Sequence, residues 1–179
     1  MLLHSLSLVA QVNGPDSLTP GDIVAVSGVA DPIPGSTVHT PLVRLAGGTF
    51  TNVVGVVESH LAFTQQPSHP QPAEGEARSE TPPSVLRSVD GPARLGDYVA
   101  ITVLGAAQVK VDDAASIEAG QRLTVAERPG HARALRTVQV EGVKVDESGP
   151  TLGTALEAAT RTEWCGCSST HSSFNYHKP

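Results

Sequence analysis

The sequence predicts an all-β protein, and three observations support this prediction. Glycine and proline are frequent, with 17 and 14 copies among 179 residues, which suits many short strands and turns better than long helices. Polar and apolar residues alternate in segments such as 108–112, the period-two pattern of a half-buried strand. Aromatic residues make up only 3% of the chain, so the core must consist of Val, Leu, Ile and Ala. We expect two small β-sandwich or β-barrel modules of short antiparallel strands, with a long Pro-rich loop and an extended C-terminal arm.

The first module is expected over residues 1–63. Leu6 and Leu8 alternate with polar residues and no basic segment precedes them, which favours a strand over a cleaved signal peptide. Residues 53–57 are apolar on both faces, so we expect a central strand there. Gly47-Gly48 is typical of a hairpin turn. The expected strands are residues 1–12, 23–26, 42–45 and 50–58.

A Pro-rich segment separates the modules at residues 64–92. It contains almost no large apolar side chains, so it cannot bury enough surface to offset its own ordering entropy. We expect a loop. Two hypotheses remain for it: a solvated loop, or an arm laid along a neighbouring subunit.

The second module is expected over residues 93–160. An apolar run at 98–104 ends at Gly105, and a shorter strand is expected at 122–125. Residues 128–131, Arg-Pro-Gly-His, fit a type II turn, because proline fixes φ at the second position and glycine accepts a positive φ at the third. Residues 136–145 carry alternating valines around a glycine, which predicts two short strands or one bulged strand.

A short pattern recurs in the two modules. Gly21-Asp22 and Gly96-Asp97 each precede an apolar strand, and Gly120-Gln121 does so more loosely. Two interpretations are open: an internal duplication of a small β unit, or independent use of the same turn chemistry.

The tail at residues 161–179 concentrates aromatic and sulfur side chains. Aromatic side chains carry large apolar areas, so we expect this tail to bury them on its own body or on a neighbour. Cys165 and Cys167 could be free thiols or form an intersubunit disulfide, since a disulfide between them would be strained. With His171 and His177 they are zinc ligands by type, but one intervening residue is too few for a zinc knuckle, and we expect no metal or other cofactor. The expected partner-binding residues are Trp164, Cys165, Cys167, Phe174 and Tyr176.

Charge and motifs argue against several classes of function. A formal charge of −6 opposes nucleic-acid binding, which needs a basic face, and docking on an anionic membrane. Neither a Gly-x-Ser-x-Gly elbow nor a phosphate-binding glycine loop occurs. His131 follows a turn, where histidines are usually surface residues, and Asp112-Asp113 would point to opposite faces of a strand. We expect no catalytic residue and no enzyme.

The second module resembles a β domain of phage structural proteins, found in capsid decoration (cement) proteins and at the ends of tail fibres and appendages. The resemblance covers residues 93–157 and departs from the pattern after Glu157, where a further apolar strand is expected; a neighbour could complete that sheet by strand addition. It implies a non-enzymatic virion structural protein, made in the host cytoplasm, that stabilises a particle as a homo-oligomer, a trimer, bound to the major capsid protein. The matching segments are Gly96-Asp97-Tyr98-Val99-Ala100, Val109-Lys110-Val111, Leu123-Thr124-Val125, Pro129-Gly130-His131-Ala132 and Leu152-Gly153-Thr154-Ala155-Leu156-Glu157.

Two alternatives stay open beside the decoration protein. One is a tail-fibre or appendage module, or an extracellular module, that binds a surface glycan; outside the tail only Phe50, Phe63 and Tyr98 could supply the aromatic surface. The other is a self-cleaving intramolecular chaperone domain, for which no matching nucleophile is found in the sequence.

Overall fold

The computed structural model describes residues 5–47, 52–65, 84–112, 116–160 and 164–168. All regular secondary structure in these residues is β-strand, which confirms the predicted all-β class. The strands form a closed barrel, a second sheet of five strands, and two smaller two-stranded sheets.

The barrel has five strands in the order β2-β3-β1-β6-β4, and pairing of β2 with β4 closes it. β1 and β3 are parallel, and the other neighbours are antiparallel. Small aliphatic side chains fill the interior, including Val24, Val43, Val57, Val99 and Ile101, as the scarcity of aromatic residues predicts. The barrel strands are β1 (Leu6–Val12), β2 (Ile23–Ala30), β3 (Thr40–Leu45), β4 (Val53–Gln65) and β6 (Tyr98–Leu104).

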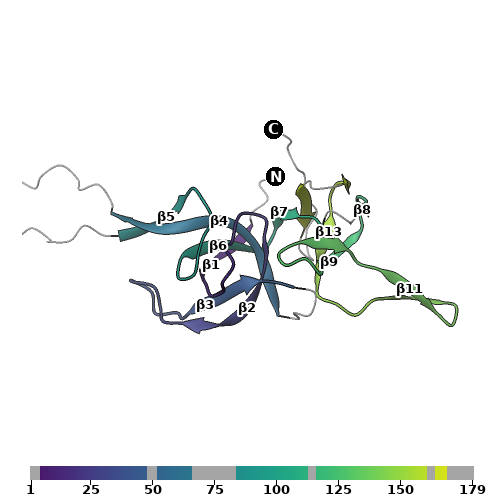
Figure 1. The fold of residues 1–179 in the computed structure, drawn as a ribbon, viewed down its shortest axis with the longest axis horizontal. Helices are drawn as coiled ribbons and strands as arrows, with labels where there is room; N and C mark the ends of the chain where they lie inside the picture. The colour runs from purple at the N-terminus through teal and green to yellow at the C-terminus, as the bar shows by residue number, and fades with distance from the viewer. Residues whose placement is uncertain (1–4, 48–51, 66–83, 113–115, 161–163, 169–179) are drawn as a thin grey trace, which may run out of the picture.

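β4 extends beyond the barrel. Its C-terminal part, from His60 to Gln65, pairs with β5 (Ser84–Val89), and the two strands form a ribbon that projects from one end of the molecule (Figure 1). The ribbon takes in parts of the segment 64–92 that the sequence predicts as a loop, because residues 64–65 and 84–89 are strand and pair with each other across the ribbon. Residues 66–83 of that segment lie outside the described part of the chain.

The second sheet has the order β10-β9-β13-β15-β7. The remaining strands pair as β8 with β14 and β11 with β12. The β11–β12 hairpin extends from the opposite end of the molecule to the β4–β5 ribbon (Figure 1). The bounds are β7 (Ala106–Lys110), β8 (Ser116–Ile117), β9 (Arg122–Val125), β10 (Ala132–Ala134), β11 (Thr137–Val140), β12 (Val143–Asp146), β13 (Thr151–Ala155), β14 (Ala159–Thr160) and β15 (Trp164–Ser168).

β6 lies in the barrel, although the sequence pattern placed it in the second module. It pairs with β1 and with β4 over most of its length. The chain passes from the barrel to the second sheet at Gly105. Its φ of 123° lies in a region that favours glycine, and a Cβ at this position would lie only 2.7 Å from the Cα atom of Ser5. The glycine that ends the apolar run therefore also marks the change of sheet.

The two units share a core. One apolar cluster combines Ile23 and Val56 of the barrel with Val109 and Leu123 of the second sheet. Beside it, the Lys110 ammonium lies 2.7 Å from the buried Asp22 carboxylate and also donates to Thr19 Oγ1. The barrel and the second sheet thus bury each other's apolar residues instead of being joined only by a linker.

Three four-residue turns share the same backbone conformation at glycine and the same side-chain hydrogen bond. In each, glycine at the third position has a φ between 86° and 89°, and the side chain of the fourth residue accepts a hydrogen bond from the amide of the first. The turns are Thr19-Pro20-Gly21-Asp22, Arg94-Leu95-Gly96-Asp97 and Glu118-Ala119-Gly120-Gln121. The turn at Arg128-Pro129-Gly130-His131 also places a positive φ of 76° at its glycine and closes with a bond from the His131 amide to the Arg128 carbonyl, as the sequence predicts.

Candidate interaction site

The β11–β12 hairpin presents an apolar face that no part of the described chain covers. Val138 pairs with Val145, and Val140 pairs with Val143. Because residues two apart in a strand lie on the same face, the four valines share one side of the hairpin. Val138 is 48% exposed, Val140 52%, Val143 63% and Val145 44%. We call Val138, Val140, Val143 and Val145 the valine face.

A tight turn sets the pairing of the hairpin. Glu141 and Gly142 are its central residues, with φ angles of 50° and 83°. Two positive φ angles define a type I′ turn, whose twist matches that of the flanking strands. The sequence alternatives of two strands or one bulged strand are thereby resolved in favour of two strands.

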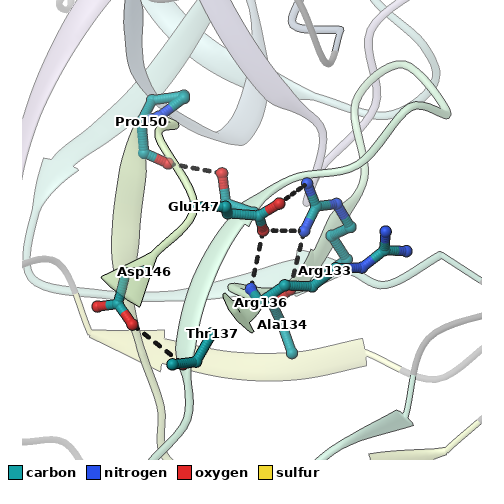
Figure 2. Close-up of polar contacts among 8 residues, drawn as sticks. Arg133, Ala134, Arg136, Thr137, Asp146, Glu147 and Pro150 are labelled. Atoms are coloured by element: carbon teal, nitrogen blue, oxygen red, sulfur yellow. Dashed lines mark hydrogen bonds and ion pairs between the residues drawn. The ribbon is translucent and has the colours of Figure 1, made fainter. Parts of the chain in front are cut away.

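An ion pair anchors the base of the hairpin, as Figure 2 shows. The guanidinium of Arg133 donates to both carboxylate oxygens of Glu147, and the Arg136 amide donates to Glu147 Oε1 at 2.8 Å. The hydrogen bond from Arg133 lowers the pKa of the Glu147 carboxyl below its ordinary value of 4.5, although burial opposes part of that shift. The same bond raises the pKa of Arg133. A bidentate arginine pair fixes direction as well as distance.

A second ion pair lies across the base of the hairpin. Arg122 Nη1 is 2.6 Å from Asp146 Oδ2, and Arg122 Nη2 donates to Thr151 Oγ1 at 3.0 Å. Thr137 Oγ1 donates to Asp146 Oδ1 at 3.0 Å and links the first residue of β11 to the last of β12 (Figure 2). The hairpin is therefore fixed to the body at its base while its strands stand in solvent.

The exposure of the valine face is energetically unusual. Four half-exposed valines represent about 3 kcal/mol of apolar burial that the described chain does not realise. A lone two-stranded hairpin is marginally stable in water, and stable ribbons usually pack one face on another element. A hydrogen-bonded base, a defined turn and an uncovered apolar face are features that suit a docking element.

The β4–β5 ribbon carries a second apolar face. Phe63 and Tyr98 pack edge to face with ring centroids 5.5 Å apart. Leu61 pairs with Tyr98 of β6 and Phe63 pairs with Leu86 of β5, so all four side chains lie on one side of the neighbouring strands β5, β4 and β6. Tyr98 alternates with the buried Val99, which places this side on the outside of the barrel. We call Leu61, Phe63, Leu86 and Tyr98 the aromatic face.

Contacts on the other side of the ribbon join it to the barrel. His60 Nε2 lies 3.5 Å from Asp97 Oδ2, and His60 Nδ1 lies 3.2 Å from the Gly91 carbonyl oxygen. The ribbon thus leaves the barrel in a defined direction, with its aromatic face outward.

An open pocket of 220 Å³ lies where the two units meet. Glu58 borders it, and Glu58 Oε2 accepts hydrogen bonds from Ser7 Oγ at 2.8 Å and Thr102 Oγ1 at 3.3 Å. Among the described lining residues, none combines a nucleophile with a base and an oxyanion hole. Within the described residues, no three His, Cys, Asp or Glu side chains gather where they could bind a metal ion. The described residues also contain no helix of the length and hydropathy needed to cross a bilayer.

The expected partner-binding residues fall into two groups. Trp164, Cys165 and Cys167 belong to β15, whose backbone pairs with β7 and β13 inside the second sheet. The chain itself thus supplies a strand after residue 157, where the sequence pattern left the edge of this sheet open. Phe174 and Tyr176 lie outside the described residues.

The other residues that the sequence offers as candidates for glycan binding or catalysis do not form one site. Phe63 and Tyr98 come together, whereas Phe50 lies outside the described residues, as does Asp113. His131 lies in its turn, with Nδ1 2.8 Å from the Pro129 carbonyl oxygen.

The sequence predicts the strands of the hairpin but not the exposure of its valine face. The available signal was the even spacing of four valines around Glu141-Gly142. That alternation predicts one apolar face, but it does not tell whether the body of the protein covers it.

Comparison with protein-family models found no match, and no curated protein matches the chain.

Proposed function

We propose that this chain is a non-enzymatic structural protein that attaches to a protein particle and reinforces contacts between subunits. The more specific form of the proposal is a capsid decoration protein, carried on the virion and bound to the major capsid protein. The resemblance of residues 93–157 to phage structural domains supports the choice of a virion.

The β11–β12 hairpin is the observation that carries this proposal. Its valine face is exposed, its turn is well defined, and Arg133 and Arg122 anchor its base through Glu147 and Asp146. Such an element suits binding to a protein surface, because apolar burial supplies affinity and the hydrogen bonds at its base limit the conformations that must be ordered on docking. The negative net charge and the scarcity of aromatic residues favour a protein partner over nucleic acid.

Cosedimentation with particles assembled from a major capsid protein tests the proposal. The full chain should sediment with the particles, and the variant Val140→Ser/Val143→Ser should bind at least about tenfold more weakly, because the changes remove the cross-strand pair of the valine face next to the turn, half of that face. The matched control Gln139→Ser/Lys144→Ser alters the cross-strand pair on the opposite face and should bind like the unmodified chain. Equal binding by both double variants, or no binding by the unmodified chain, would contradict the proposal.

A further inference from the structure

We propose that the pocket at the junction of the two units receives a lysine side chain of a partner protein, with the Glu58 carboxylate as its charged contact. The identity of the partner rests on the proposed function, whereas the chemistry of the pocket stands without it. The pocket has a volume of 220 Å³, and its lining comes from both units, including Val57, Glu58 and Thr102 of the barrel and Ala106 and Gln108 of β7.

A β-bulge places Glu58 beside the pocket. Val57 pairs with Ile101 and Ser59 pairs with Ala100, so Glu58 is an extra residue of β4 without a partner of its own on β6. An extra residue breaks the regular alternation of a strand, and bulges often redirect a side chain next to a functional site. Glu58 therefore borders the pocket while the preceding Val57 belongs to the barrel core.

Two hydroxyl groups hold the Glu58 carboxylate and leave one of its oxygens available. Ser7 and Thr102 are direct partners on β1 and β6, and both hydroxyls donate to Glu58 Oε2, at 2.8 Å and 3.3 Å. Each carboxylate oxygen offers about two lone pairs, so Oε2 already has its full set of donors. Oε1 accepts no hydrogen bond from the described residues, and it is the oxygen that a ligand can reach.

The charge of Glu58 has no counter-ion among the described residues, where its partners are the two hydroxyls. Lys110 follows Gln108 by two residues on β7, but its ammonium is held by Asp22 and Thr19. Glu58 is the one ionisable side chain among the described lining residues. The pocket thus presents a single negative charge that a cation would neutralise.

The size and lining of the pocket fit one lysine side chain. Its 220 Å³ is less than the roughly 300–1,000 Å³ of sites for drug-sized ligands. Pro20, Ala106 and Ala107 offer apolar surface to a methylene stem, and Glu58 meets the charged end, which matches the two-part character of lysine. Arginine fits less well, because a guanidinium binds best to both oxygens of a carboxylate and Oε2 is already occupied.

Proton–nitrogen NMR spectra of the full chain test the pocket with the lysine side chain alone. Acetyl-lysine amide, added at millimolar concentration and low ionic strength, should shift the amide signals of Glu58, Thr102 and Ala107. Acetyl-norleucine amide has a similar stem without the charge and should bind at least about fivefold more weakly, because a hydrogen bond to a charged group is lost. Acetyl-arginine amide should also bind more weakly than the lysine compound. Absence of shifts with the lysine compound, or equal binding by either of the other two, would overturn the inference.

Substitutions in the pocket show whether Glu58 makes the contact. Glu58→Gln removes the charge but keeps an oxygen that can accept from Ser7 and Thr102, and it should weaken binding of the lysine compound at least about fivefold. Ala106→Leu keeps the charge but fills part of the pocket from an exposed position, and it should weaken binding as well. The matched control Glu118→Gln removes an exposed carboxylate outside the pocket and should leave binding unchanged. Binding that survives Glu58→Gln would overturn the inference.

Cosedimentation with particles of the major capsid protein tests whether the lysine belongs to that partner. Glu58→Gln should bind the particles at least about fivefold more weakly than the unmodified chain, and Glu118→Gln should bind equally well. Undiminished binding of Glu58→Gln would overturn the inference and leave the proposed function intact. Failure of the unmodified chain to sediment would instead remove the proposed function and the partner with it, while the NMR titration would still decide the chemistry of the pocket.

Discussion

Gly55 packs in the barrel with no room for a side chain. A Cβ at this position would lie 2.3 Å from the Thr102 carbonyl oxygen and 2.8 Å from Ile101 Cγ2. Both neighbours are part of β6, so neither can move without disturbing the pairing of β4 with β6. The glycine that interrupts the apolar run at residues 53–57 therefore permits the close approach of these two strands.

We predict that Gly55→Ala lowers the free energy of unfolding by about 3 kcal/mol, the upper range for an overpacked core. Gly28→Ala is the matched control in a barrel strand, where the added Cβ would make an ordinary contact at 3.5 Å from Leu42 Cδ1. It should leave stability unchanged or raise it slightly, by restricting the unfolded chain. Urea unfolding followed by circular dichroism measures both. If Gly55→Ala and Gly28→Ala lowered the free energy of unfolding by similar amounts, the close contact at Gly55 would not explain the loss of stability.

The recurring Gly-Asp pattern is explained at the residue scale by turn chemistry. Gly21, Gly96 and Gly120 have the same positive φ, and the residue after each caps its turn with a side-chain hydrogen bond. This shared construction was predictable from the glycines, because other residues rarely adopt that φ. Turn chemistry alone accounts for the similarity of the three Gly-containing segments, so no duplication of a β unit is required. Two of the three turns, at Gly21 and Gly96, precede strands of the same barrel.

At the scale of single elements, Glu147 controls the hairpin base through its charge. The carboxyl has a lower pKa in the folded protein than in the unfolded chain, mainly because Arg133 donates to it. Such a group contributes stability at pH values above its unfolded pKa, and that contribution disappears as the pH falls through the folded pKa.

We predict that Glu147→Gln lowers the free energy of unfolding by about 1–3 kcal/mol near pH 7, as expected for hydrogen bonds to a charged group. The difference between Glu147→Gln and the unmodified chain should shrink as the pH falls below 4.5, the ordinary value for the group. Urea unfolding over a pH series gives this difference directly. Glu141→Gln, at the exposed turn, should stay within about 0.5 kcal/mol of the unmodified chain near pH 7. A difference for Glu147→Gln that does not change with pH would contradict the role of the charge.

At the scale of the whole molecule, the shared core should make unfolding cooperative. Ile23 and Val56 of the barrel pack in the same cluster as Val109 and Leu123 of the second sheet, and Asp22 pairs with Lys110 across the junction. Loss of either unit would expose the apolar surface of the other, so neither should persist alone.

Because the two units share a core, we predict that a destabilising substitution in the barrel also lowers the urea midpoint at which the second sheet unfolds. In Gly55→Ala the clash lies in the barrel, whereas the single tryptophan, Trp164, belongs to β15 of the second sheet. The fluorescence of Trp164 and the far-ultraviolet circular dichroism should therefore shift to the same lower urea midpoint in this variant. A tryptophan transition that stays at the midpoint of the unmodified chain would show that the two units unfold independently.

The sequence by itself determined the fold class, most of the strands and the turns, because alternation, glycine and proline act over a few residues. The tertiary structure alone decided which strands share a sheet. The run at residues 98–104 has the same local pattern whichever unit it joins, and its place in the barrel follows from long-range pairing with β1 and β4. The same holds for the site. The four valines of β11 and β12 look like core residues in the sequence, and they remain exposed because no described part of the chain packs on them.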